Sequence, residues 1–169
     1  MSITLRIPRD IHGALLDDLR SPHPFAAERV AFCHVTFGNR GHEHSLVLVT
    51  DFWSVPDDQF IDDPESGARI NGTAIRFAMQ SILDHGRGVL HVHFHDWPGS
   101  PIYSKMDRTE IPRLVHSFRP VNPDVPHGML VLSPDSARAS IALPRCEVLE
   151  TARQISIVGW PTRIIKVER

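Results

Sequence analysis

Residues 91–108 read HVHFHDWPGSPIYSKMDR, and this stretch decides how the rest of the chain is interpreted. It begins inside Gly88 to His95, a run that predicts a strand. Successive side chains on a strand alternate between its two faces, so His91, His93 and His95 point the same way. Neighbours on that face are about 6.5–7 Å apart at the backbone. Two such imidazoles can lean together onto one metal ion.

A carboxylate follows at a spacing that favours the same ion. Ser104 is a good N-cap for a predicted helix, and Asp107 lies three residues further on, as in a capping box. Both side chains can therefore aim at the end of the strand. The loop 96–103 contains two prolines and a glycine, which predicts a fixed shape. His93, His95 and Asp107 would then be three zinc ligands, and the fourth position is left for water, as in catalytic sites.

Working outward, the pattern predicts an α/β (α+β) domain with a mixed, mainly antiparallel sheet and about three helices. Two of the strands form a hairpin around the turn signal Asn39-Arg40-Gly41. Residues 55–70 are acidic and irregular. We treat residues 1–169 as a single domain. The expected strands are 2–7, 28–37, 45–53, 88–95, 129–132 and 137–143, with one or two more in the C-terminal tail, and the expected helices follow Pro8 and cover 71–85 and 104–118.

The composition excludes several classes of function. The chain has 169 residues, of which 41% are hydrophobic and 22% charged, as in an ordinary globular protein. A net charge of -2 gives no general attraction to nucleic acid or anionic membranes, and no apolar run is long enough for a membrane span. Two isolated cysteines and the lack of an apolar signal core favour the cytoplasm. Eleven histidines are many for this length and point to metal.

These motifs resemble the JAB/MPN (JAMM) family of zinc metalloproteases, in its prokaryotic branch associated with ubiquitin-activating-like enzymes. That family carries His-x-His, a loop and Ser-x-x-Asp, here His93-Phe94-His95 and Ser104-Lys105-Met106-Asp107. It also has a glutamate on an earlier strand, which corresponds to Glu28 at the start of the strand 28–37. The resemblance covers the order of elements from about residue 5 to residue 143.

The resemblance implies a cytidine-deaminase-like fold and a zinc-dependent isopeptidase or peptidase. Its substrate would be an amide bond after the C-terminus of a ubiquitin-like or sulfur-carrier-like protein. Zn²⁺ would be held by His93, His95 and Asp107, with Glu28 as general base and Ser104 as donor to the oxyanion. Partners would be the ubiquitin-like protein or its conjugate, together with activating or conjugating enzymes of the same system, and no nucleic acid or membrane.

The chain departs from the family pattern at two points. Asp96 follows the second histidine, where the family usually has proline, and eleven residues rather than ten separate His95 from Asp107. One extra loop residue is easily absorbed. It leaves His91 as a rival ligand, although we interpret His91 as a structural or supporting histidine.

Other interpretations stay open at this point. His42 and His44 form a second candidate metal pair, but their loop position favours surface exposure. The acidic loop around Asp62 either contacts a basic substrate or is simply solvated, and we favour the second. Trp97 lies in the loop beside the site and is a candidate for substrate contact. The competing functions are a non-catalytic MPN-type scaffold and a metal-binding module without protease activity.

Overall fold

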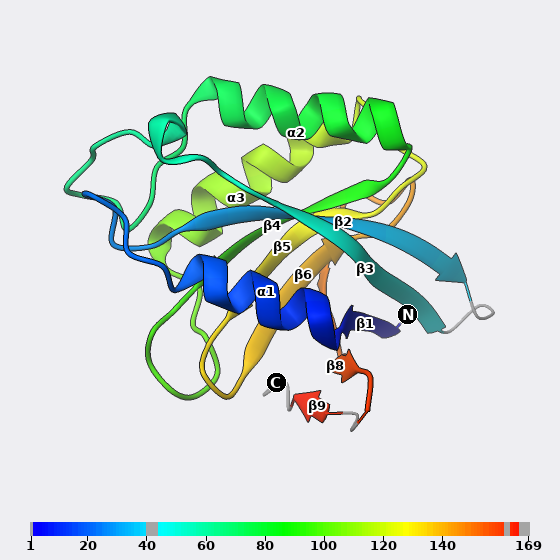
Figure 1. Cartoon of the computed structure of the whole chain (residues 1–169). Helices are drawn as coiled ribbons and strands as arrows, with labels where there is room; N and C mark the ends of the chain where they lie inside the picture. Colours follow the sequence, from blue (N-terminus) through cyan, green and yellow to red (C-terminus); the bar gives the residue numbers. More distant parts are fainter. Residues whose placement is uncertain (1, 40–43, 161–162, 166–169) are drawn as a thin grey trace.

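The computed structural model describes residues 2–39, 44–160 and 163–165. Figure 1 shows the order of its helices and strands along the chain. They are β1 (Ser2–Pro8), α1 (Arg9–Leu19), β2 (Val30–Asn39), β3 (His44–Ser54), the short 3-10 helix η1 (Asp57–Gln59), α2 (Gly72–His85), β4 (Gly88–Phe94), α3 (Lys105–Phe118), β5 (His127–Leu132), β6 (Ala137–Ala142), β7 (Leu149–Thr151), β8 (Gln154–Val158) and β9 (Arg163–Ile165).

The strands form one mixed sheet in the order β7-β6-β5-β4-β2-β3-β1-β8-β9. β1 is parallel to β3 and β8, and β4 is parallel to β5, whereas the other five pairings are antiparallel. Only two residues separate β7 from β8, although the two strands are far apart in this order. Ala152 donates to the carbonyl of Ala139 and Arg153 to that of Ile3, which draws the two regions together. The sheet is therefore strongly curled.

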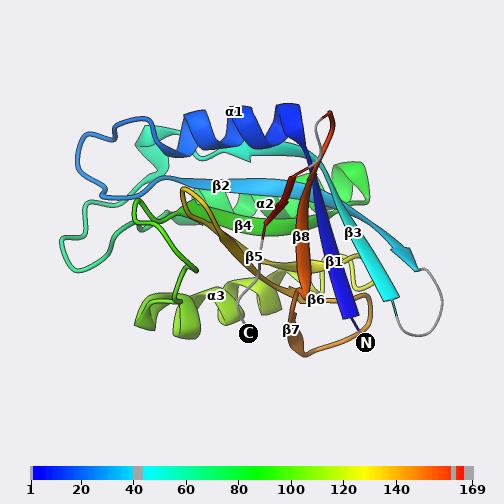
Figure 2. The same cartoon turned by 90° about the horizontal axis from the view of Figure 1, so that it is seen from below.

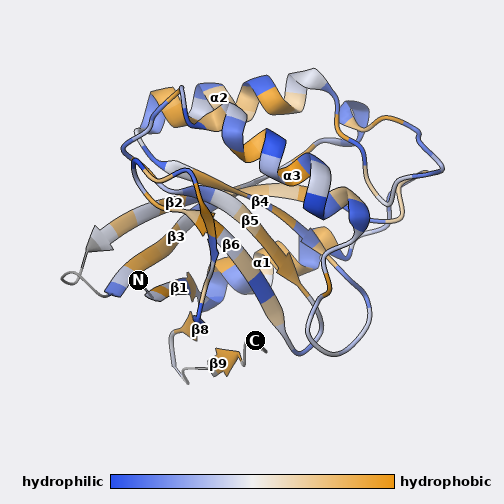
Figure 3. Cartoon of the chain, turned by 180° about the vertical axis from the view of Figure 1, so that it is seen from behind, coloured by the Kyte–Doolittle hydropathy of each residue, from blue (hydrophilic) through white to orange (hydrophobic). Residues whose placement is uncertain are grey.

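Helices cover both faces of the sheet. Helix α1 lies on one face, and α2 and α3 lie on the other (Figures 1 and 2). Under α1, Leu15 and Leu19 pack into the larger core. Under α2, Ala78 and Ile82 pack into a second core with Phe32. In Figure 3, α2 and α3 carry both hydrophobic (orange) and hydrophilic (blue) stretches, while the central strands are mostly hydrophobic. Helices of this kind pack their hydrophobic side onto the sheet.

Local signals explain where α2 begins and ends. The side chain of Asn71 accepts hydrogen bonds from the backbone N–H groups of Thr73 and Ala74 at the first turn. Gly86 follows the last residue with φ of 60°, the left-handed conformation that glycine adopts without a steric penalty. The helix therefore stops two residues before β4 begins, and it lies over the strand that carries the histidines.

The expected mixed α/β class with three helices is confirmed. The cytidine-deaminase-like topology of the JAMM family stays a prediction. Two details differ from expectation. The C-terminal part contains three short strands rather than one or two, and β2 begins at Val30, so Glu28 lies in the bend before the strand. The hairpin turn at Arg40 and Gly41, and His42, lie outside the described residues. Among the described helices, none has the length and apolar character to cross a membrane.

Candidate metal centre

Strand β4 presents its histidines on the face covered by α2 and α3. Its alternate residues Leu90 and Val92 pack into the core under α1, so the side chains between them must point to the other face. His91, His93 and His95 are all buried there, with exposed fractions of 6%, 3% and 3%. The backbone N–H of His95 still bonds to the carbonyl of Leu132, which continues the pairing with β5 by one residue.

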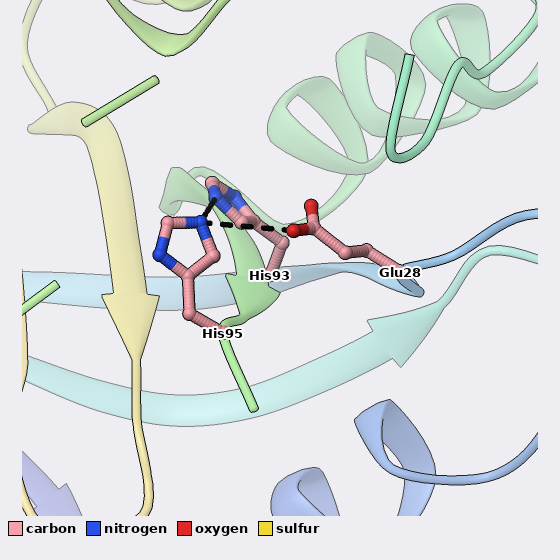
Figure 4. A group of neighbouring side chains, drawn as sticks. All are labelled: Glu28, His93 and His95. Carbon is pink, nitrogen blue, oxygen red and sulfur yellow. Dashed lines mark hydrogen bonds and ion pairs between the residues drawn. The ribbon is translucent and has the colours of Figure 1, made fainter. Parts of the chain in front are cut away.

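The ring nitrogens of His93 and His95 and a carboxylate oxygen of Glu28 lie close together. The Nε2 atoms of His93 and His95 are 3.2 Å apart, and Oε1 of Glu28 is 3.8 Å from Nε2 of His95. Figure 4 shows the three side chains pointing toward one another. One ligand atom from each lies within 4.8 Å of the others, so the three could hold a metal ion. Ligand atoms around a tetrahedral zinc ion are about 3.3 Å apart, as follows from bond lengths near 2.0–2.1 Å.

Asp107, near the start of α3, lies beside His93 but is not one of the three residues whose ligand atoms are all within 4.8 Å of one another. Its Oδ2 accepts a hydrogen bond from the backbone N–H of Ser104, at 2.7 Å, while its Oδ1 lies 3.4 Å from Nε2 of His93. Ser104 Oγ accepts in turn from the N–H of Asp107, which completes a capping box. One oxygen of Asp107 thus takes part in the helix cap and the other faces His93.

The electrostatics of the two carboxyl groups differ. Burial raises the pKa of Glu28, and the nearby charge of His93 opposes this only in part. Burial alone would also raise the pKa of Asp107, but the contact with His93 and the hydrogen bonds from Ser104 hold it well below its usual range. Asp107 is therefore the better permanent anion, and Glu28 is the carboxylate that binds a proton more readily.

The irregular segment 55–70 supports Glu28 from the side. The backbone N–H of Glu28 donates to the carbonyl of Gly67 at 3.0 Å. A Cβ atom added at Gly67 would lie 3.1 Å from the carboxyl carbon of Glu28, so a larger residue would push the carboxyl group away. Gly67 was not among the residues proposed from the sequence. Its only signal was a glycine after Ser66 in an acidic loop.

His91 occupies the same face without joining the cluster. Its ring centre is 5.7 Å from that of His93 and 5.7 Å from that of Phe32. Burial lowers the pKa of His91 to about 3, so the ring is neutral. Within the described part of the chain, the buried Nδ1 atoms of His91, His93 and His95 have no hydrogen-bond partner. The orientation of these rings therefore depends on packing, as where Trp97 stacks on His95 at 4.3 Å between ring centres.

A cavity of about 1020 Å³ opens onto the cluster. It contains Glu28, His93, His95 and Asp107 in its wall, and it extends between α2 and α3. Trp97 also lines it, at the position where the sequence suggested substrate contact. A volume of this size is at the upper end of the range of about 300–1,000 Å³ that is usual for ligand pockets.

The residues proposed from the sequence meet in this cavity. Glu28, His93, His95, Ser104 and Asp107 all line it, from the bend before β2, from β4 and from the start of α3. Two aspartates of the acidic loop form ion pairs within the chain. Asp63 pairs with Arg69 of the same loop, and Asp57 pairs with Arg29, which precedes β2. His44 of the second candidate pair bonds to Ser2, and its partner His42 lies outside the described residues. Half-buried side chains of α2 at the cavity, such as Met79, carried no functional signal in the sequence.

Comparison of the chain with protein-family models and with curated proteins gives no match. The proposed function therefore rests on the residues of the site.

Proposed function

We propose that this protein is a zinc-dependent isopeptidase or peptidase of the JAMM type. In this proposal it hydrolyses an amide bond after the C-terminus of a ubiquitin-like or sulfur-carrier-like protein. The observation that carries the proposal is the convergence of His93, His95 and Glu28 in an open cavity, with Asp107 3.4 Å from Nε2 of His93. A purely structural histidine cluster would not place two carboxylates beside it at the wall of a large cavity.

The donor set fits zinc. Imidazole nitrogens and a carboxylate oxygen are usual zinc ligands, and three protein ligands leave a position open for chemistry. We assign His93, His95 and Asp107 as the ligands, because Asp107 stays ionised and is held by the helix cap. The two carboxylates near the histidines also match the charge of a divalent cation. Zinc, when bound, supplies a Lewis acid that lowers the pKa of water and polarises a carbonyl group.

Glu28 would act as the general base and general acid. Glu28 lines the cavity with its Oε1 3.8 Å from Nε2 of His95, and burial raises its pKa toward the range in which it can accept a proton and return it. Glu28 would take a proton from the attacking water and deliver it to the nitrogen of the leaving amine. The absence of a side chain at Gly67 would leave the space that this position of the carboxyl group requires.

Ser104 would stabilise the transition state. Its side chain lines the cavity, and its Oγ accepts a hydrogen bond from the backbone N–H of Asp107. A donor at this place can bond to the oxygen of the scissile carbonyl as negative charge develops on it.

The test combines metal content with hydrolysis. The purified full chain should contain about one zinc per molecule by mass spectrometry. The substrate would be a ubiquitin-like protein with a peptide extension after its terminal diglycine. Chelation should abolish cleavage, and added zinc should restore it. Glu28→Gln should retain zinc but lose about 10²–10⁴-fold in kcat, which is the usual contribution of general acid–base catalysis.

Glu65→Gln is the matched control, because Glu65 is an exposed glutamate in the neighbouring loop. It should change neither zinc content nor rate. Zinc binding without hydrolysis of any fusion would reduce the protein to a metal-binding module. The absence of stoichiometric metal, with no effect of chelators, would overturn the metal centre itself.

A further inference from the structure

The cavity beside the metal centre has an apolar part that the proposed chemistry does not use. Beyond the histidines, it runs between α2 and α3 and is lined by Ile75 and Met79 on one side and Leu114 on the other. These side chains are only half buried, although they belong to the edge of the second core. Apolar surface that is preformed and concave gains free energy when a ligand covers it.

The charges around the cavity favour an uncharged ligand group in its apolar part, between α2 and α3. At its rim, Arg69 pairs with Asp63 and Arg113 with Glu110, each at 2.9 Å. These cations are already matched by the chain's own carboxylates. The remaining carboxylates, Glu28 and Asp107, lie at the histidine end, where a bound divalent ion would offset them. Among the described lining residues, the apolar part therefore has no unmatched charge that would recruit an ionic group.

His91 is a buried polar group in this region. It lines the cavity and is 94% buried, and its Nδ1 has no hydrogen-bond partner among the described residues. A buried polar group without a partner is costly, so the fold retains it at a cost to stability. One polar ring within an apolar wall is the pattern of a pocket that orients a mainly apolar ligand.

We propose that the space between α2 and α3 is a specificity pocket that receives one large apolar side chain of the substrate, near the scissile amide. This inference rests on the proposed function and names a feature of its substrate. A tail of glycine alone would leave the pocket empty. The preferred substrate therefore carries leucine, methionine or phenylalanine at one fixed position on one side of the cleaved bond, in an extended segment that follows the cavity.

The test uses capped peptides in which one position at a time, from three before to three after the amide, is varied. Glycine, aspartate, leucine and phenylalanine are compared at each position. Binding is measured by calorimetry on the zinc-loaded full-length Glu28→Gln protein, and cleavage is measured on the wild type. We expect one position at which leucine or phenylalanine binds at least about tenfold more tightly than glycine, with aspartate weakest.

Substitutions locate the preference in the pocket. Met79→Trp fills the space and should remove the preference, whereas Leu83→Trp on the same helix should keep it, because Leu83 is 61% exposed. Leu114→Gln makes the opposite wall polar and is a second test should Met79→Trp fail to fold. Zinc content should be unchanged in all three variants.

The outcomes separate the pocket from the reaction. Equal binding of all side chains at every position, together with zinc-dependent cleavage, would overturn the pocket and leave the hydrolase intact. A preference that survives both Met79→Trp and Leu114→Gln would also overturn it. A preference in binding that these variants remove, without cleavage of any peptide, would support the pocket and overturn the hydrolase.

Discussion

His91 and His93 lie on the same face of β4, but their rings contact different groups. Nε2 of His93 faces both His95 and Asp107, whereas the ring of His91 packs edge-on against Phe32. We expect His93→Gln to weaken zinc binding by more than the roughly 10–100-fold that is lost with a supporting group. His91→Phe should keep one zinc per chain. Competition with a chromophoric chelator measures both, and loss of zinc in His91→Phe would make His91 a ligand.

Asp107 and Ser104 share the start of α3, and substitution can separate their roles. Ser104→Ala removes the acceptor for the N–H of Asp107 and should lower the free energy of unfolding by about 1 kcal/mol. Zinc affinity should change little. Asp107→Asn can still accept from the N–H of Ser104 but lacks the negative charge, so it should weaken zinc binding more than it destabilises the helix. Thermal unfolding and zinc titration of both variants check this, and the reverse pattern would contradict it.

At the scale of elements, the pairing of β5 with β6 depends on a close backbone approach. A Cβ atom at Gly128 in β5 would collide with the backbone carbonyl oxygen of Ser140 in β6. This contact involves backbone, which cannot move aside without breaking the ladder. Because β5 is also the parallel partner of β4, any shift would reach the strand that carries the histidines.

We therefore expect Gly128→Ala to cost about 1–3 kcal/mol or more in free energy of unfolding, as overpacked core substitutions do. Gly13→Ala in α1 is the matched control. A Cβ there meets nothing within 4 Å, and alanine favours a helix by about 0.8–1.0 kcal/mol over glycine. Urea unfolding should show opposite signs for the two variants. Equal stability of Gly128→Ala and the wild type would contradict the close approach.

The elements also show how far the sequence predicts the site. The period of two on β4 placed His91, His93 and His95 on one face, and the Ser-x-x-Asp spacing predicted the cap of α3, which the structure has. These are local properties, because a strand fixes its faces and a helix its first turn within a few residues. Glu28 was proposed mostly from the family resemblance, and its place beside His95 follows from a bend before β2 that no local sequence pattern predicts.

At the scale of the whole molecule, buried neutral histidines link stability to pH. His127 is 1% exposed, and burial lowers its pKa. Its Nε2–H donates to the carbonyl of Asn122 at 3.0 Å, and its Nδ1 accepts the N–H of Val89 at 3.4 Å. Protonation of Nδ1 would break the second contact. The folded chain therefore holds the neutral ring, while the unfolded chain binds a proton below about pH 6.5.

The free energy of unfolding should consequently fall as the pH decreases from about 6.5 toward the lower pKa of folded His127. Above about pH 6.5, His127 does not make the free energy of unfolding depend on pH, because its ring is then neutral in both the folded and the unfolded chain. His127→Gln does not titrate and should show a shallower fall over the same range. Urea unfolding of both proteins between pH 5 and 8 measures the difference. Parallel curves would show that His127 does not take part in the linkage.

The sequence by itself determined the mixed α/β class, the shared face of the three histidines and the cap that carries Asp107. Each of these follows from the spacing of residues within one strand or one helix turn. The tertiary structure decided which two histidines converge, where Glu28 stands, and that a cavity opens between α2 and α3. These depend on how β2, β4 and β5 pair and on how two helices pack on the sheet. Such contacts join residues far apart in the chain, and no local periodicity encodes them.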